Sequence, residues 1–538
     1  MVTDYGEGLR QVLLDEAHIE EVYDFRDSGV FEDATNYPAI VILEDEPDEA
    51  AREDNDIRCV RVKANTDKEN DRELDEAIIE AVRDHRGEPG YSDEFIDVFD
   101  FPQRRLSGPD YWPLMPPEEL QVFEKLEDRQ DAVIGDVTDA VFQGIRTSAN
   151  KIYVVDVLDA NRIESDDEGD IVTVVPTGES EEYKIETDLL RPFLEGDEVT
   201  RWRGNWGGLH VIHPYYAETA DNGELDAGLY SQDYLKENLP KTWEFFLEHK
   251  NALEGREGGR KDGKDDWYGY IYPKNLGKFE QPKIIQAHIC QDATFMLDEV
   301  GTWYFSTAYS VLLSDNYRDL TEEMVCQLNS KALDFYFKHI TTVKMGGYYE
   351  YRSQYVEKLP CVTEDNADVF GTMRETAGEI IDTIDLDSKA DRFPEAYLGD
   401  YDGELDYISY EWQTRRYPVN ADVQADVDDN FTVQAGRSDT INDPAMYSDD
   451  REARKLRAEY VHAAVDGRNV KSGEETTIPI PRDDAGVEEL LDRLEADRDE
   501  VRQTDIGALE SVIDEAVYDL FDLTEDEREV VEDYLEVF

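Results

Sequence analysis

Basic residues are scarce in this chain. Its 538 residues include 54 Lys and Arg against 129 Asp and Glu, which gives a net charge of −75. Hydrophobic residues still make up 40% of the chain, so the composition is that of a folded globular protein and not of a disordered acidic one. We expect a protein adapted to molar cytoplasmic salt, where the Debye length is about 3 Å and self-repulsion is largely screened.

This acidity limits what can be concluded about partners. At ordinary salt such a charge would argue against binding nucleic acid, but at molar salt both long-range repulsion and counterion release are weak. Binding would then depend on base-edge hydrogen bonds, shape and aromatic contacts. The net charge therefore indicates the salt concentration in which the protein works and does not decide whether it binds nucleic acid.

Cysteine is rare, and long apolar runs are missing. The four cysteines are Cys59, Cys290, Cys326 and Cys361, far apart and without a CxxC pair. We expect free thiols in a reducing cytosol and no zinc site. No apolar run approaches the roughly 18 residues of a membrane-spanning helix, and the N-terminus lacks the apolar core of a signal peptide. These features predict a cytoplasmic protein with no membrane partner.

The hydrophobic pattern predicts a mixed α+β fold in three regions. Residues 1–105 are expected to form an α/β fragment: a helix with Leu9, Val12, Leu13 and Ala17 on one face, strands at 19–25, 38–43 and 58–63, and a helix at 74–82. The run 38–43 is continuously apolar, which predicts a strand buried on both faces. The fragment is too small for a complete doubly wound sheet.

The second region, residues 118–362, follows two segments rich in Gly and Pro (87–95 and 107–119) and alternates strands with helices, as in an α+β domain. The third region, 363–538, is expected to be an acidic linker followed by a mostly helical end. Residues 421–450 are predicted to be a solvated loop or linker. A helical pair is expected at the C-terminus, with Thr524 and Glu527 at capping-box spacing.

Side chains suited to nucleic acid gather in three segments. In FQGIRTSANKIY (142–153), Gly144 allows a tight turn beside the donors Arg146, Thr147, Ser148, Asn150 and Lys151. Residues 267–285 hold three lysines and one acid, including Lys274 and Lys278; residues 328–360 hold five Lys and Arg and three acids, including Lys344 and Arg352. The second and third segments are rich in tyrosine. Around Gly346 and Gly347 we expect contacts from Tyr348, Tyr349, Arg352 and Gln354.

These segments resemble a known family. FQGIRTSANKIYVVD (142–156), followed by DLLRPFLEGDEVTRW (188–202), resembles the opening of the TaqI-like specificity domain of adenine-specific DNA methyltransferases and single-chain restriction–modification enzymes. The LNS helix and Gly-Gly-Tyr loop of 328–360 resemble its end. This chain has Ser148 where the family commonly has a second glycine.

Residues 9–43 resemble the last part of the catalytic domain in the same family, with its F-x-x-A-T-x-Y loop at Phe31, Ala34, Thr35 and Tyr37. The resemblance implies that 1–105 is the C-terminal fragment of a methyltransferase domain and that 118–362 selects a sequence in double-stranded DNA.

The motifs of the catalytic step are missing. Methyl transfer to adenine requires a glycine-rich turn after a strand for S-adenosylmethionine and a Pro-Pro-aromatic tetrapeptide for the flipped base. DYGEG (4–8) has no preceding strand, MPPE (115–118) lacks the aromatic residue, and HPYY (213–216) is interpreted as a strand end. We therefore predict no catalytic residues and no cofactor site in this chain, although S-adenosylmethionine is implied for the complete enzyme.

Nuclease and metal sites are not predicted either. Asp48 and Asp110 each follow a proline, as in the first half of a magnesium-binding nuclease motif, but no nearby strand supplies the second half. His210 and His213 have a metal-like spacing without further ligands, and we interpret them as ordinary surface or core histidines.

Three interpretations remain. The first is the target-recognition part of a site-specific adenine DNA methyltransferase, with the catalytic half supplied by another polypeptide. The second is a stand-alone DNA-binding module or an inactive gene remnant. The third is a halophilic interaction protein that does not contact DNA. A neighbouring reading frame with the missing motifs would favour the first, and selective DNA binding by the lone chain would favour the second.

Overall fold

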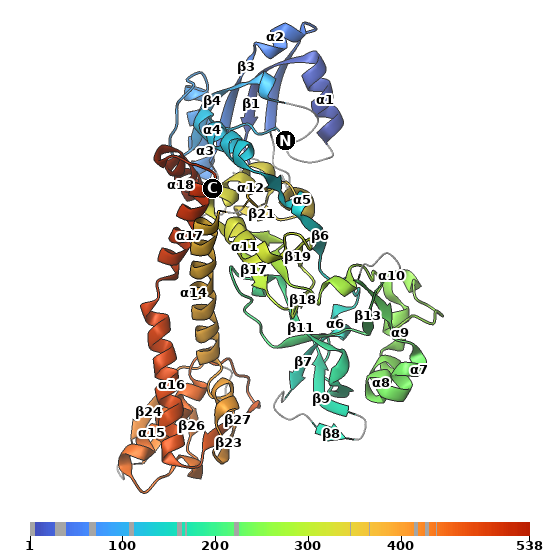
Figure 1. Ribbon diagram of the computed structural model, residues 1–538, viewed down its shortest axis with the longest axis vertical. Helices are drawn as coiled ribbons and strands as arrows, with labels where there is room; N and C mark the ends of the chain where they lie inside the picture. Colours follow the sequence, from blue (N-terminus) through green and yellow to red (C-terminus); the bar gives the residue numbers. More distant parts are fainter. Residues whose placement is uncertain are drawn as a thin grey trace. The chain divides into compact units, whose positions relative to one another are not determined.

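The computed structural model describes residues 6–26, 39–63, 72–106, 112–158, 164–166, 169–219, 225–344, 346–364, 366–413, 418–425, 430–436 and 438–538. Helices and several small sheets are mixed along the chain, which confirms the α+β fold class (Figure 1). The chain forms two compact units: unit 1 comprises residues 1–377 and 510–538, and unit 2 comprises residues 378–509. The finer division into 1–105, 118–362 and 363–538 stays a prediction.

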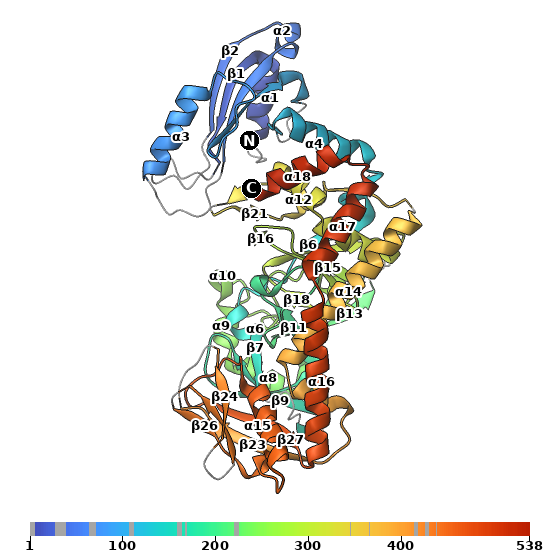
Figure 2. The ribbon, with the colours of Figure 1, turned by 90° about the vertical axis from the view of Figure 1, so that its left-hand side faces the viewer.

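Unit 1 begins with a four-stranded sheet in the order β2-β1-β3-β4. Its elements are α1 (Glu7–Glu16), β1 (Ala17–Asp24), β2 (Ala39–Asp45), α2 (Glu49–Glu53), β3 (Asp56–Val62), α3 (Arg72–His85) and β4 (Ile96–Pro102). Strands β1 and β3 are parallel, and the two outer pairs are antiparallel. Leu13 and Leu14 of α1 pack on one face and Ile78 of α3 on the other, so helices cover both faces (Figure 2).

Strand β2 corrects one sequence prediction. The strand exists, but it lies at the edge of the sheet and is not buried on both faces. Its side chains Ile40, Ile42 and Leu43 are 47%, 37% and 42% exposed. An apolar run cannot by itself distinguish a central strand from an edge strand, because the neighbours that cover it come from elsewhere in the chain. The F-x-x-A-T-x-Y loop at 31–37 lies outside the described residues.

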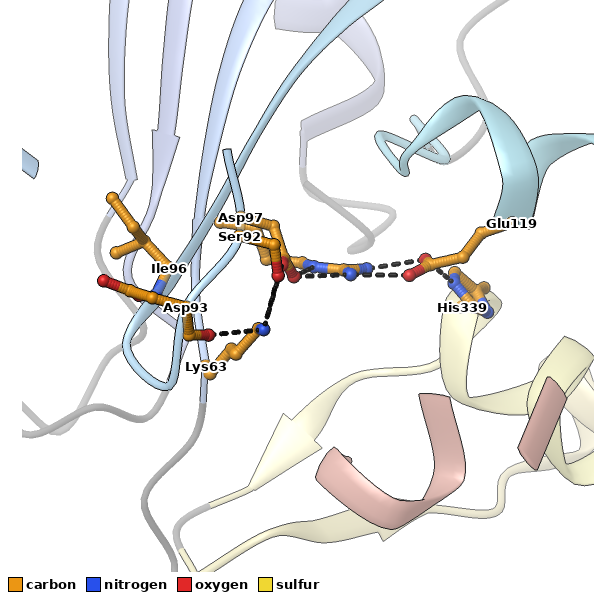
Figure 3. A network of polar contacts seen from close by, with 8 residues as sticks. Lys63, Ser92, Asp93, Ile96, Asp97, Glu119 and His339 are labelled. Atoms are coloured by element: carbon orange, nitrogen blue, oxygen red, sulfur yellow. Dashed lines mark hydrogen bonds and ion pairs between the residues drawn. The ribbon is translucent and has the colours of Figure 1, made fainter. Parts of the chain in front are cut away.

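A buried arginine connects this sheet to the rest of unit 1. Arg61 of β3 bonds Asp97 of β4 at 2.8 Å and Glu119 of α4 (Pro117–Arg129) at 2.6 Å, with its side chain 4% exposed. His339 of α12 (Lys331–Ile340) places Nε2 3.0 Å from Glu119, as Figure 3 shows. The Arg61 guanidinium also lies 4.8 Å from the ring centre of Phe538. One charge therefore joins the sheet, two helices and the C-terminus.

The middle of the chain contains two larger sheets. The first has the order β17-β15-β19-β6, with β6 (Thr138–Gln143), β15 (Lys283–Ala287), β17 (Phe295–Asp298) and β19 (Ala308–Leu313). The second has the order β10-β9-β7-β12-β11-β18, with β8 beside β9; its strands are β7 (Val154–Leu158), β8 (Glu164–Asp166), β9 (Gly169–Pro176), β10 (Tyr183–Glu186), β11 (Leu190–Leu194), β12 (Leu209–Ile212) and β18 (Tyr304–Phe305). A continuous aromatic core, including Phe142, Tyr153 and Phe305, joins them.

Shorter elements complete this part of unit 1. They are α5 (Ile134–Val137), α6 (Asn150–Tyr153), α7 (Gln232–Asn238), α8 (Pro240–Glu248), α9 (Lys250–Glu254), α10 (Arg256–Gly259), α11 (Thr321–Asn329) and α13 (Ser353–Val356), with the strand pairs β13 (Tyr215–Thr219) and β14 (Leu225–Leu229), and β5 (Ala132–Val133) and β22 (Pro360–Cys361). A three-stranded sheet has the order β16-β21-β20, with β16 (Ile289–Cys290), β20 (Val343–Lys344) and β21 (Tyr348–Glu350).

Unit 2 corrects a second prediction. Residues 421–450 include β24 (Ala421–Ala425), β25 (Phe431–Ala435) and β26 (Asp439–Ile441), which form an antiparallel sheet and not a solvated linker. Val433 and Ile441 are buried against a core shared with α15 (Arg451–Val465). The remaining elements are β23 (Leu405–Glu411), β27 (Glu475–Pro481) and α16 (Asp484–Gln503). The acidic residues that surround these short strands in sequence obscured the alternation of apolar residues in β25, where Phe431, Val433 and Ala435 are buried.

The predicted C-terminal helices are confirmed. They are α17 (Ile506–Leu520) and α18 (Glu525–Val537), and α14 (Ala367–Asp391) precedes unit 2's strands in sequence. Thr524 and Glu527 form the expected capping box. Helix α18 contacts α4 and α12, and Glu527 also accepts a bond from Lys125 at 2.6 Å. The C-terminal helix is thus part of the packing that surrounds Arg61.

The Arg61 network makes stability depend on pH. Burial alone would raise the pKa of Glu119, but the Arg61 charge and hydrogen bonds from Arg61 and His339 lower it from 4.5 to about 2. The ionised carboxylate therefore stabilises the fold above pH 4.5, and this contribution is lost as the pH falls toward 2. We expect Glu119→Gln to lower the free energy of unfolding at pH 6 and to differ little from the parent protein near pH 2. Urea unfolding at several pH values measures both, and a pH-independent difference would contradict the assignment.

Candidate nucleic-acid interface

Gly144 allows the chain after β6 to approach β18 closely. A Cβ atom there would lie 2.4 Å from the carbonyl oxygen of Phe305, so a larger residue cannot fit. The next residue, Ile145, donates its backbone N–H to that same carbonyl at 2.8 Å. This contact fixes where the following loop leaves the sheet.

The loop presents some predicted donors and buries one. Arg146, Ser148 and Asn150 are exposed, whereas Thr147 is completely buried. The Thr147 hydroxyl donates to Asn150 Oδ1 at 2.6 Å and accepts from the backbone N–H of Ala149 at 2.9 Å. A direct ligand contact by Thr147 is therefore ruled out in this conformation; its hydroxyl shapes the loop instead.

Ser148 has the backbone conformation of a glycine. Its φ is +57°, in the left-handed region, and its hydroxyl donates to Glu257 at 2.9 Å. Glycine adopts this left-handed conformation without strain, so Ser148 occupies a position that would suit a glycine.

The third predicted segment, 328–360, contains the hairpin β20–β21. Gly346 and Gly347 have φ values of +84° and +72°, as a tight turn requires. Tyr348 is 41% exposed, but Tyr349 is only 1% exposed and its hydroxyl donates to the Phe538 carbonyl oxygen at 3.2 Å. Tyr349 is therefore buried in the packing of this hairpin, and its role as a DNA contact stays a prediction. Gln354 lies half-buried in α13.

A buried glutamate organises the cations of this hairpin. Glu350 accepts from Lys344 at 3.1 Å and from Arg352 at 2.6 Å, and its side chain is 6% exposed. The Nε2 atom of His288 lies 3.3 Å from the same carboxylate. Burial favours the neutral form of Glu350, but the bonds and charges of Lys344 and Arg352 outweigh it and lower its pKa. Burial lowers the pKa of His288, which favours neutral imidazole.

Tyr309 connects the two predicted segments. It pairs with Gln143 between β19 and β6, and Gln143 accepts a bond from Arg146 at 2.6 Å. Its ring lies 5.4 Å from that of His288. Burial raises the pKa of Tyr309, while the charges of Arg352 and Arg146 act to lower it. His288 in turn lies 3.3 Å from Glu350, the partner of Arg352, so a series of contacts through Tyr309 links the segment of Arg146 to the segment of Arg352.

The second predicted segment, 267–285, contacts this cluster only in part. The backbone of Arg146 forms a β-bridge with Tyr272, two residues before the exposed Lys274. Lys278 is partly buried in a short 3-10 turn, and Lys151 is exposed in α6. Among the contacts of the described residues, none links Lys151 or Lys278 to the cluster around Tyr309.

Sequence reasoning missed four residues of this cluster: Gln143, His288, Tyr309 and Glu350. Tyr309 lies in β19, where sequence reasoning singled out no residue. A tyrosine followed by Ser310 in a mostly apolar strand was the available signal. Glu350 is negatively charged, so it does not fit the pattern of basic and hydrogen-bond-donating residues that predicts DNA contacts.

The motifs that superficially resemble catalytic ones have structural roles. Gly6 and Gly8 lie at the start of α1, and Pro117 opens α4. In the HPYY segment, Tyr215 begins β13 as expected, and burial lowers the pKa of His213 to about 3. Asp48 caps α2. Asp110 lies outside the described residues.

The described residues include neither a metal-ligand cluster nor a membrane-spanning helix. The described part of the chain holds no group of three or more His, Cys, Asp or Glu side chains arranged for a metal ion. Within the same described ranges, every helix is too short or too polar to cross a bilayer.

The left-handed conformation of Ser148 can be tested by two substitutions. Both Ser148→Gly and Ser148→Ala remove the hydroxyl, but only glycine adopts positive φ without strain. We expect the glycine variant to have the higher free energy of unfolding, by about 1 kcal/mol. Chemical unfolding of the two variants side by side measures this difference. Equal stability, or a more stable alanine variant, would contradict a left-handed residue at this position.

Comparison with known proteins finds a family match for part of this region. Residues 191–361 match the TaqI-like C-terminal specificity domain. The chain is also 21% identical over 363 residues to the type II methyltransferase M.BstVI of Geobacillus stearothermophilus, a match that covers 66% of this chain and 55% of that protein. The chain thus spans about half the length of this relative. Strand β6 precedes the matched residues but pairs with β19 inside them. Residues 191–361 are thus similar to a TaqI-like C-terminal specificity domain.

Proposed function

We propose that this chain selects the DNA target of a site-specific adenine methyltransferase whose catalytic half is supplied by another polypeptide. The specificity domain and the methyltransferase relative support DNA recognition in such a system. The resemblance described above supports adenine as the base. The contacts that link Arg146 to Arg352 through Gln143, Tyr309, His288 and Glu350 carry the proposal, because they connect exposed guanidinium groups from two distant segments.

The chemistry of this surface suits a duplex. Arginine bonds guanine and phosphate bidentately, and exposed tyrosine offers a stacking face. Arg146, Lys344, Arg352 and Tyr348 provide these groups in a chain whose net charge is −75. At the molar salt that the composition predicts, such short-range contacts outweigh the general attraction of phosphate.

The first sheet supports a separate catalytic half. Its β4 edge is closed by the preceding loop, where Gly90 donates to Val98 and Val98 donates to Tyr91 at 2.7 and 2.8 Å. The β2 edge instead exposes Ile40, Ile42 and Leu43, and an exposed apolar edge strand favours pairing with another chain.

The sequence lacks both the glycine-rich cofactor turn and the Pro-Pro-aromatic tetrapeptide. S-adenosylmethionine and the flipped adenine would then be bound by the other half, and this chain would choose the site.

Reconstitution tests the proposal. The polypeptide to combine with this chain is the one encoded beside it that carries the two missing motifs. With S-adenosylmethionine and a plasmid mixture, we expect methylated adenines at one sequence only when both polypeptides are present. Each polypeptide alone is the control. Absence of such a neighbour, or a methylation pattern that does not need this chain, would contradict the proposal.

Selective DNA binding by the lone chain without any effect on methylation would favour the stand-alone module instead. A mobility-shift assay in molar potassium chloride makes this measurement. It keeps the screening conditions that the composition predicts.

Arg146 and Arg352 give a sharper test. We expect Arg146→Ala and Arg352→Ala to weaken binding of the preferred sequence by about 1–3 kcal/mol, as for loss of a bidentate base contact. Binding of unrelated duplexes should change less. Arg502→Ala, an equal charge change at an exposed helical site of unit 2, should leave selectivity intact. Equal weakening on all sequences would indicate phosphate contacts instead.

A further inference from the structure

We propose that Glu350 is a positioning residue that sets the selectivity of this interface by fixing the directions of Arg352 and Lys344. The inference rests on the proposed function, because it assumes that the surface reads DNA. Glu350 would not contact DNA itself, since its side chain is 6% exposed.

The carboxylate uses both of its oxygens. Oε1 accepts from Arg352 at 2.6 Å and lies 3.3 Å from His288 Nε2, while Oε2 accepts from Lys344 at 3.1 Å. The two cations are far more accessible than their anchor, with side chains 47% and 36% exposed. The charged end of each cation therefore bonds the buried carboxylate, while the rest of its side chain is partly exposed to solvent.

Glu350 lies in the paired strand β21. Glu350 pairs with Ile289 between β21 and β16, and its carbonyl accepts from the Thr341 hydroxyl at 2.7 Å and from the backbone N–H of Arg352 at 3.1 Å. A side chain on a paired strand holds its partners more exactly than one on a free loop. The arginine and lysine that would otherwise sample many rotamers are thereby preorganised.

Two opposite effects follow from removing this anchor charge. Arg352 and Lys344 would lose their fixed directions, which lowers selectivity, because bidentate base recognition depends on geometry. The local charge would also rise by one, which increases attraction to phosphate on any sequence. Loss of folding, in contrast, would weaken binding to every sequence.

The test is Glu350→Gln in the full-length chain, with the catalytic polypeptide added if binding requires it. Selection from a random duplex library by the parent protein first defines the preferred sequence. We expect the variant to lose roughly tenfold in the ratio of preferred to unrelated affinity. Affinity for an unrelated duplex should be unchanged or higher, with a steeper dependence on potassium chloride. Glu364→Gln, an equal charge change at an exposed glutamate outside the cluster, should leave the ratio unchanged.

Glu350→Asp covers the case in which the glutamine variant does not fold. It keeps the charge but shortens the side chain by one methylene, so selectivity should fall while the salt dependence stays that of the parent.

An unchanged ratio in the folded variants would overturn the role of Glu350 while leaving the proposed function in place. If the parent protein selects no sequence, alone or with the catalytic polypeptide, the proposed function fails and the role of Glu350 fails with it.

Discussion

The ion pairs of Arg61 hold the first sheet in its place within unit 1. A guanidinium that is 4% exposed needs carboxylates within bonding distance, since burying an unpaired charge costs several kcal/mol. Asp97 comes from the neighbouring strand, but Glu119 comes from a helix outside the sheet. The ring of Phe538, the last residue, lies against the same guanidinium. Sheet, helix and C-terminus are therefore constrained by one another, and a shift of any of them would leave a charge buried without its partner.

This constraint reaches the candidate interface through a short series of contacts. His339 lies beside Glu119 on α12, and the same helix leads directly into β20 and the β21 hairpin. Tyr349 of that hairpin bonds the carbonyl of Phe538, so the residue that covers Arg61 also holds the strand carrying Glu350. The buried network and the exposed cluster are thus two ends of one packed region. The position of Arg352 depends on packing far from the surface that it occupies.

Sequence reasoning located the segments of the interface but not its organisation. Donor-rich loops and glycine turns are local patterns, so Arg146, Arg352 and the Gly346–Gly347 turn could be identified. Burial depends on parts of the chain that are distant in sequence. The residues next to Thr147 and Tyr349 in sequence do not show what covers these two side chains, so both were predicted to contact DNA. The same reason explains β2, whose apolar run lies at an edge, and β25, whose short strand is hidden among acidic residues. Tyr309 and Glu350 can be identified as part of the candidate interface only from the residues that the fold brings into contact with them.

The arrangement also accounts for how so acidic a chain could read DNA. Surface cations spread over an open patch would lose most of their attraction at molar salt, because screening there acts within about 3 Å. Hydrogen bonds between groups in contact are much less sensitive to salt, provided that the donors already point in the right direction. A buried carboxylate such as Glu350 can supply that direction, since its own side chain is only 6% exposed and bonds Lys344 at 3.1 Å and Arg352 at 2.6 Å. At the proposed molar salt, an acidic residue inside the proposed interface would thus support selectivity and would not oppose binding.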